Sequence, residues 1–415
     1  MGLGNIWRFP YLTGKDGGAA FLVIYLVCVF ALGIPGMIGE FIIGRHGGSN
    51  AARAYYKMSG GKPWWIVGAV GALTSTIILG FYAVVAGWCL QYLYASVAGQ
   101  LIGDAHYVET YFQEFSTDPV KPVLCTLGFI LLTHAVVVNG VRNGIEKVSN
   151  LLMPTLFVLL IIIAVASCML PGASEGISFL FKPDFSKVDK DVMLDALGQA
   201  FFSLSITGSG MIIYGSYLPK NEDVVHSSCM TAVLDTCAAM LAGFAILPSV
   251  FAFGLDPASG PKLLFITLPR VFQQMPFGRL FAFFFFISVL FAGITSLANM
   301  LEAVSEAAQT RLKLSRKAAV LLACGAALAV GLFIERDALM GTLMDVITIY
   351  VVPIGAILGA VMAYWVLGID KMEQELMNGR SKPLSRAFAP LAKYVYIFLA
   401  ALVVFFSFII PGGIG

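Results

Sequence analysis

Charged residues are scarce in this sequence. Of its 415 residues, only 12% are Asp, Glu, Lys or Arg, whereas 59% are hydrophobic. Soluble domains usually carry about 25% charged residues, so these charges are too few to cover the surface of a soluble fold. The net charge of +2 also provides no basic field of the kind that would indicate a nucleic-acid partner.

Metal and redox motifs are lacking as well. The seven cysteines fall mainly in apolar stretches, without the close pairing of zinc or redox motifs, and we interpret them as packing residues. The four histidines are scattered, and none pairs with another at metal-ligand spacing. The apolar stretches also contain no pair of a nucleophile and a base. Without such a pair or a metal cluster, we do not expect an enzyme.

Long apolar runs fill the chain instead. A bilayer core of about 30 Å needs roughly 20 apolar residues per helix, and ten runs are long enough, or nearly so, to cross it. They lie at 19–44, 65–98, 122–139, 147–170, 193–218, 227–254, 277–308, 317–334, 338–368 and 388–411. The sequence therefore predicts an all-α, multi-pass membrane protein in contact with lipid, and a short apolar segment at 1–12 precedes the long ones.

The order of these runs suggests two halves. We expect a first group of five helices at 1–170, an outward-facing loop at 171–191, a second group of five at 192–368, a cytoplasmic loop at 369–387 and a last helix at 388–415. The loops richer in Lys and Arg are expected to be cytoplasmic.

Two stretches are unsuited to a continuous helix. Residues 2–5 read Gly-Leu-Gly-Asn, and residues 205–210 read Ser-Ile-Thr-Gly-Ser-Gly. Each lies in the opening segment of one group of five, and paired interrupted helices in corresponding positions point to a transporter's midplane site. The alternative is that these glycines merely allow close helix packing.

Acidic residues inside apolar runs are a second signal, because an ionised side chain at the bilayer centre costs roughly 2.5–3.5 kcal/mol unless it is paired. Asp235 is the clearest case, since apolar residues surround it on both sides. Glu40, Glu302 and Asp345 could instead lie near helix ends, where an exposed charge needs no function. In the run 277–308, Ala292, Thr295 and Ser296 offer carbonyl and hydroxyl oxygens suited to an alkali cation, although Ser and Thr often only bond back to their own helix.

The motifs together identify a family. Residues 2–11 (Gly-Leu-Gly-Asn-Ile-Trp-Arg-Phe-Pro-Tyr) and 16–21 (Asp-Gly-Gly-Ala-Ala-Phe) resemble the opening of neurotransmitter:sodium symporters. The resemblance continues through the stretches 33–35, 144–147, 153–156 and 292–296 and covers nearly the whole chain. It implies inverted five-helix repeats with discontinuous first and sixth helices, eleven helices in all, and a location in the bacterial inner membrane.

The resemblance also implies a substrate site. Backbone N–H groups of Leu3 and Gly4 and the hydroxyl of Tyr82 would hold the substrate carboxylate, and Gly2 stands where relatives for monoamines carry an Asp. The substrate should therefore be an amino acid. Its side chain would meet Ile78, Phe202, Ser205, Gly208, Ser296, Asn299 and Met300. Gly208 stands where a relative for small substrates has Phe, which favours a bulky or aromatic amino acid, while Asn299 could serve a polar one.

Two sodium sites follow from the same resemblance. The first would use Asn5, Ser203 and Asp235, and the second Ala292, Thr295 and Ser296. In chloride-dependent relatives a neutral Asn occupies the position of Asp235. The fixed charge predicts chloride independence, with Gln199 and Tyr25 as remnants of a chloride site.

The resemblance is incomplete at the gates. Arg8 and Asp345 would form the outer gate, but Thr310 stands where the acidic partner of the inner gate is expected. The chain also begins at the first helix break, so that we expect a fragment or a late start, and poor transport as written. These departures leave a second hypothesis open, namely an amino-acid-binding membrane sensor of the same fold that does not transport. The oligomeric state is not predicted.

Overall fold

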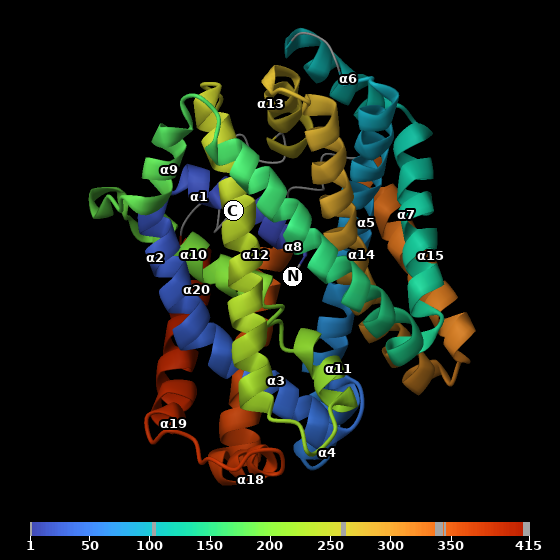
Figure 1. The fold of residues 1–415 in the computed structure, drawn as a ribbon. Helices are drawn as coiled ribbons and strands as arrows, with labels where there is room; N and C mark the ends of the chain where they lie inside the picture. The colour runs from blue at the N-terminus through green and yellow to red at the C-terminus, as the bar shows by residue number, and fades with distance from the viewer. Residues whose placement is uncertain (1, 102–104, 259–262, 337–342, 344–345, 410–415) are drawn as a thin grey trace.

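The computed structural model describes residues 2–101, 105–258, 263–336, 343 and 346–409. These residues form helices and connecting turns, without a strand (Figure 1). Among them, eight helices are long and apolar enough to cross a membrane, or nine if the bent pair His106–Thr117 and Lys121–Val137 counts as one span. The all-α, multi-pass architecture expected from the sequence is therefore confirmed.

The N-terminal helices form a short arm and a long one. The short arm consists of η1 (Gly4–Arg8) and α1 (Phe9–Lys15). Gly17 and Gly18 then turn the chain at φ values of 83° and 63°, in the left-handed region that glycine tolerates best. The long arm joins α2 (Ala19–Cys28), η2 (Val29–Gly33) and α3 (Ile34–Gly47) into one span of 29 residues.

A series of long and short helices follows up to residue 187. They are α4 (Ala51–Met58), α5 (Trp65–Ala98), α6 (Ala105–Thr117), α7 (Lys121–Val137), η3 (Val141–Glu146), α8 (Lys147–Cys168), α9 (Ala173–Phe181) and η4 (Phe185–Lys187). The 34-residue helix α5 carries Ile78 and Tyr82 among its buried residues.

The run predicted at 193–218 is broken in two. Helix α10 (Lys190–Ser203) ends before Leu204, and α11 (Gly210–Tyr217) begins after Ser209. Between them, Ser205 and Gly208 have φ values of 55° and 76°, which a right-handed helix cannot contain. The small, polar composition of this stretch thus produces the interruption predicted from it.

The second half ends in a series of long and short helices. They are α12 (Val224–Ala252), η5 (Leu263–Thr267), α13 (Leu268–Gln274), α14 (Gly278–Leu312), α15 (Arg316–Arg336), η6 (Val346–Val351), α17 (Val352–Val361), η7 (Met362–Gly368), α18 (Ile369–Met377), α19 (Phe388–Pro390), η8 (Leu391–Val395) and α20 (Tyr396–Ile409).

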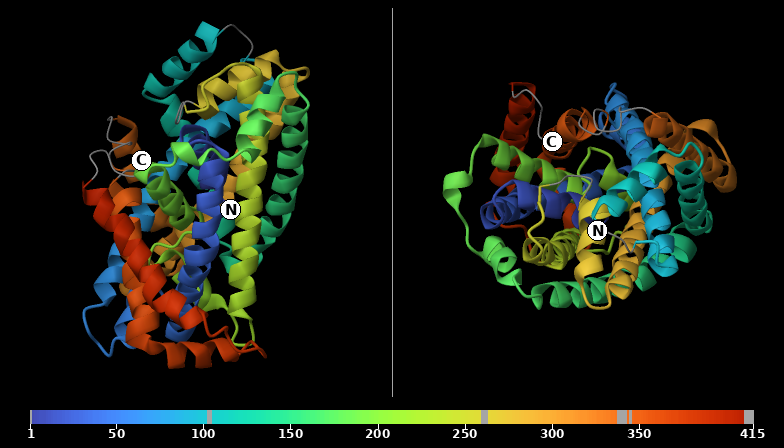
Figure 2. Two further views of the ribbon diagram at one scale, coloured as in Figure 1. Left: turned by 90° about the vertical axis from the view of Figure 1, so that its left-hand side faces the viewer. Right: turned by 90° about the horizontal axis from the view of Figure 1, so that it is seen from above.

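The long helices run roughly along one direction and pack around the broken helix (Figures 1 and 2). α14 packs on α5, α11 on α3, and α12 on α8. Large apolar side chains such as Leu73, Val158 and Phe398 are exposed on the outside, whereas Glu40 and Glu302 are buried inside. This inverts the usual soluble pattern and fits a bundle surrounded by lipid.

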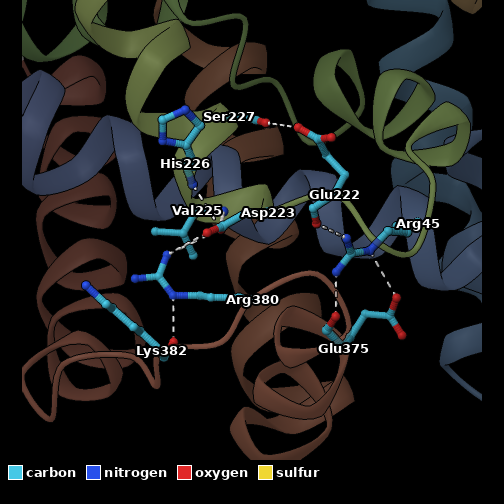
Figure 3. Close-up of polar contacts among 9 residues, drawn as sticks. All are labelled: Arg45, Glu222, Asp223, Val225, His226, Ser227, Glu375, Arg380 and Lys382. Carbon is cyan, nitrogen blue, oxygen red and sulfur yellow. Dashed lines mark hydrogen bonds and ion pairs between the residues drawn. The ribbon is translucent and has the colours of Figure 1, made fainter.

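Ion pairs tie the loops together at one end of the bundle (Figure 3). The Arg45 guanidinium, at the end of α3, contacts the Glu375 carboxylate of α18 at 3.0 Å and donates to the Glu222 carbonyl at 2.8 Å. Arg380 pairs with Asp223 at 3.3 Å. The loop between α11 and α12 is thereby fastened to α3 and to the segment that contains α18.

Candidate functional site

The unwound segment between α10 and α11 is held by side chains from two other helices. The Glu40 carboxylate of α3 accepts hydrogen bonds from the N–H groups of Gly208, at 2.6 Å, and Met211, at 2.8 Å. The Tyr55 hydroxyl of α4 donates to the Gly208 carbonyl at 2.7 Å. Main-chain groups freed by the break are thus satisfied inside protein, as a bilayer requires. Glu40 is buried here and does not lie at an exposed helix end.

Beside this break, three predicted ion ligands come together. The Asn5 amide donates to the Ser203 hydroxyl and to the Asp235 carbonyl, both at 3.1 Å. The Ser203 hydroxyl in turn donates to the Asp235 carboxylate. Asn5 and Asp235 are each 2% exposed. The Ser203 hydroxyl and the Asp235 carboxylate, both hard oxygen ligands, thus meet in a buried place beside the Asn5 amide, whose oxygen accepts from the Gly2 N–H at 2.8 Å.

The second predicted set lies on α14, opposite the chain start. The Thr295 hydroxyl bonds back to the Ala292 carbonyl at 3.1 Å and to the Phe291 carbonyl at 3.2 Å. A Cβ atom added to Gly2 would lie only 2.1 Å from the Ser296 hydroxyl oxygen. Ser296 therefore faces the first backbone segment, and Thr295 uses its hydroxyl within its own helix.

A cavity opens between α5, α14 and the broken helix. It encloses about 930 Å³ of empty space, part of which is open to solvent, and most of the predicted substrate residues line it. These are Gly4, Ile78, Tyr82, Phe202, Ser205, Ser296, Asn299 and Met300, together with Asn5, Ser203 and Asp235 from the first ion set. Leu3 is fully buried beside the cavity and does not line it.

Gly208 is, after Leu3, the second predicted substrate residue outside the cavity wall. It does not line the cavity, and a Cβ atom built on it would lie 2.3 Å from the Gly355 carbonyl of α17. A side chain at this position would therefore meet α17 and not the cavity. The interpretation that Gly208 enlarges the cavity is wrong, because its φ of 76° and the closeness of α17 determine which residue fits there.

Sequence reasoning missed several residues of the cavity wall. They are Ser75, Leu204, Thr207, Gly210, Met211, Tyr214, Thr231 and Ala303. Helical spacing could have found some of them, because Ser75 lies three residues before Ile78 and Ala303 three after Met300, each on the same helix face. Tyr214 is notable because its hydroxyl donates to the Asn299 amide oxygen across the cavity.

Arg8 lies on the side of the cavity that the loop charges predict to face outward, which is called the outward side here, and the opposite side is called inward. Its guanidinium donates to the Gln199 amide oxygen at 2.7 Å and lies over the Phe202 ring, 5.6 Å from the ring centroid. Asp345, the predicted gate partner, is outside the described residues. Gln199 also donates to the Gly4 carbonyl at 3.4 Å, and the Tyr25 hydroxyl lies 3.5 Å from that of Ser203.

Beyond Arg8, two carboxyl groups meet at the outward end. Asp16, in the turn between α1 and α2, is 6% exposed and lies against Asp195 of α10. Lys15 pairs with Asp195 at 2.9 Å. Burial and the charge of Asp195 together raise the pKa of Asp16 to about 8, because an ionised Asp16 would be desolvated next to a second carboxylate.

On the inward side, α11 and α14 are joined by a second tyrosine bond. The Tyr217 hydroxyl donates to the Glu302 carboxylate at 2.7 Å, one turn beyond the Tyr214–Asn299 bond on both helices. Arg316 of α15 also binds Glu302, at 3.1 Å and 2.6 Å. Thr310 instead donates to Glu306 at 2.9 Å. The inward contact thus lies two turns before Thr310 along α14.

Two further cavities neighbour the first one. The second shares Ser75 and Ala303 with it, and the third shares Trp65 and Arg311 with the second. The Arg311 guanidinium lies 5.2 Å from the centroid of the Trp65 ring. The three cavities therefore form a row of neighbours that runs from the first cavity to Trp65 and Arg311.

Metal-binding clusters of the usual kind are not found in the described part of the chain. No group of three or more His, Cys, Asp and Glu side chains could hold a metal ion there, and the seven cysteines are free thiols. The ion ligands described above are mostly neutral oxygens, so this search does not address them.

Comparisons with known proteins give one consistent result. The family model described as "Sodium:neurotransmitter symporter family" matches residues 1–121 and 106–411. An uncharacterized sodium-dependent transporter of Bacillus subtilis is 42% identical over 306 residues, which are 73% of this chain and 68% of that protein. Another, from Methanocaldococcus jannaschii, is 34% identical over 401 residues, covering 91% of this chain and 80% of its own.

A solved structure matches nearly end to end. The crystal structure of MhsT in complex with L-phenylalanine superposes with a TM-score of 0.91 at 34% identity, covering 98% of this chain and 95% of the other. Such overlap means that the two chains share the same fold over nearly their whole lengths.

Proposed function

The chain belongs to the sodium:neurotransmitter symporter family, and on that premise we propose that it carries a neutral amino acid across the cell membrane together with sodium, by alternating access and without chloride. Its relatives are transporters and not enzymes. The observation that carries the proposal is the meeting of Asn5, Ser203 and Asp235 beside the unwound segment at the wall of one cavity.

The substrate's two ends would bind to different parts of the cavity. The carboxylate would accept from main-chain N–H groups near Gly4, where the positive end of the first helix favours an anion, and from the Tyr82 hydroxyl. A Cβ on Gly4 would lie 3.6 Å from that hydroxyl, so both groups can reach one carboxylate. The bulky L-phenylalanine held by the related MhsT supports a bulky or aromatic side chain.

Sodium is a cargo in this scheme, and two oxygen sets fit it. The Asp235 carboxylate, the Ser203 hydroxyl and the Asn5 amide would bind the first ion next to the substrate carboxylate. The Ala292 carbonyl and the hydroxyls of Thr295 and Ser296 would contribute to the second. Each net charge moved inward gains about 2.3 kcal/mol per 100 mV, and each tenfold sodium gradient adds about 1.4 kcal/mol.

Chloride independence follows from the charge of Asp235. The negative charge of this carboxylate is part of the protein itself and balances the charge of the cation, so no mobile anion is needed. The remaining polar groups already have protein partners, since Gln199 binds Arg8 and the Gly4 carbonyl.

Closure would use contacts on both sides of the cavity. Arg8 and Gln199 would close it outward. The Tyr214–Asn299 and Tyr217–Glu302 bonds join the broken helix to α14 and would separate when the inward path opens. Inner closure would thus depend on Glu302 and Arg316 in place of the acid that Thr310 replaces.

Uptake into proteoliposomes that contain the natural full-length protein tests this proposal. We expect accumulation of radiolabelled L-phenylalanine with an inward sodium gradient, none with choline, and no loss when gluconate replaces chloride. Asp235→Asn should reduce uptake in gluconate by about 10-fold or more, because interactions with charged groups are worth about 1.5–3 kcal/mol, and chloride should restore part of it. The exposed Asp191→Asn is the matched control.

Each outcome has a distinct meaning. Uptake by the wild-type chain that is indifferent to sodium would overturn the proposal. A chloride requirement in the wild type would overturn chloride independence alone. Sodium-dependent binding without any flux would favour the alternative of a non-transporting sensor.

A further inference from the structure

A polar side chain faces the substrate cavity among apolar ones. Asn299 lines the cavity and is exposed, although Leu297 and Ala298 just before it on α14 are buried. Its amide oxygen accepts from the Tyr214 hydroxyl, but its amide nitrogen makes no hydrogen bond with any residue the structure describes. A donor held in place by a tyrosine is therefore turned toward the substrate.

Asn299 lies one helical turn beyond the second predicted ion set on α14. Ser296, one turn earlier on the same helix face, is the residue against which Gly2 packs, and Asn299 follows about 4.5 Å further along the helix axis. The bound amino group and carboxylate belong at the Gly2 level, near Asn5 and Asp235. Asn299 would therefore meet the tip of the substrate's side chain.

The walls between these two ends suit a flat ring. Ile78, Phe202, Met211 and Met300 line the cavity and present apolar surface. The flexible thioethers of the two methionines adapt to and contact aromatic rings favourably. A substrate with a short aliphatic side chain would not fill this space and would not contact Asn299.

Resting on the function proposed above, we propose that Asn299, oriented by Tyr214, recognises a hydroxyl group on the far edge of an aromatic substrate, so that the site prefers L-tyrosine to L-phenylalanine. A phenol hydroxyl accepts from the Asn299 amide nitrogen and can donate to the Tyr214 oxygen. If the nitrogen and oxygen of the Asn299 amide exchange places, the phenol would donate to the amide oxygen. The preference therefore does not depend on which of these two atoms faces the substrate. L-Phenylalanine would displace water from the amide without replacing its hydrogen bond.

Competition binding tests this inference. Purified full-length protein is loaded with tritiated L-phenylalanine in sodium, and unlabelled L-tyrosine and L-phenylalanine compete for the site. We expect L-tyrosine to compete about tenfold more strongly, the effect of one net hydrogen bond. Asn299→Leu, which keeps the volume, should bring the two competitors to equal strength while L-phenylalanine still binds. Tyr214→Phe should lower the preference without abolishing binding.

The control makes the same replacement elsewhere. Asn139→Leu changes an exposed asparagine after α7 and should keep the tenfold preference. Equal competition in the wild type, or a preference that survives in Asn299→Leu, would overturn the inference while sodium-dependent binding of L-phenylalanine leaves the proposed transport intact. Binding that ignores sodium would instead count against the transport proposal itself.

Discussion

The Glu40 carboxylate accepts a hydrogen bond from the N–H of Gly208 at 2.6 Å, although these residues are far apart in the chain. A second bond, from Met211 at 2.8 Å, lies on the other side of the helix start at Gly210. One buried side chain on α3 thus fixes the geometry of the interruption in a different helix. The irregular backbone beside the cavity is held in place and is not merely unwound.

Replacing Glu40 should therefore loosen the site as well as the fold. Glu40→Gln keeps one acceptor oxygen and loses the other, which leaves a buried N–H without its partner at a cost of about 1–3 kcal/mol. We expect a lower melting temperature in detergent and weaker sodium-dependent substrate binding. The exposed Glu146→Gln should change neither. If Glu40→Gln keeps the melting temperature and the substrate binding of the wild type, the unwound segment does not need the Glu40 carboxylate.

Gly208 is expected to act through the backbone and not through substrate size. Gly208→Ala combines a left-handed φ with a Cβ only 2.3 Å from the Gly355 carbonyl, so we expect a loss of roughly 2 kcal/mol or more. Gly254→Ala is a matched control, because Gly254 has a φ of 62° but nothing within 4 Å of its added Cβ. Thermal unfolding of both variants separates the clash from the φ strain. A stable Gly208→Ala protein with changed substrate preference would contradict this account.

Asp16 predicts a pH dependence of stability. Its folded pKa, about 8, lies above the unfolded value near 3.9, so the folded state retains a proton that the unfolded state releases. The contribution of Asp16 to the free energy of unfolding is therefore fully present below pH 4 and is lost as the pH rises toward 8. The charges around it are those of Asp195, Lys15 and Arg8.

Asp16→Asn should remove this slope. We expect its melting temperature at pH 8.5 to exceed that of the wild type by about 2–4 °C, roughly 1 kcal/mol, and to converge with it near pH 4. Melting curves between pH 4 and 9 measure the effect, with Asp191→Asn as the control. A wild-type curve that rises between pH 5 and 8 with the same shape in Asp16→Asn would refute the prediction.

Local composition was enough to predict the break, whereas the two sets of ion ligands came from the family resemblance and stay a prediction. A stretch of Ser, Thr and Gly inside an apolar run can be read directly, and so can one acidic residue such as Asp235 in the next run. What could not be predicted is the pairing of side chains across helices. Glu302 was ambiguous because only the packing of α14 against α11 brings Tyr217 to it, and Gly208 was misinterpreted because the approach of Gly355 is a tertiary fact.

The Glu302–Arg316 pair offers the sharpest test of the inward contact. Glu302 is fully buried, whereas 27% of the Arg316 side chain is exposed. Arg316→Ala would leave a buried carboxylate with the Tyr217 hydroxyl alone, and breaking a buried pair in this way costs about 3–5 kcal/mol.

Glu302→Gln should be milder, because a neutral amide needs no counter-ion. The double variant should consequently be more stable than Arg316→Ala alone, a coupling that thermal unfolding can measure with the exposed Arg386→Ala as the control. If the two single losses simply add, the pair is not coupled, and Arg316 acts by its contact with the Val137 carbonyl at 2.7 Å. Coupling together with faster release of bound substrate would link this pair to inward closure, since the same carboxylate binds the broken helix through Tyr217.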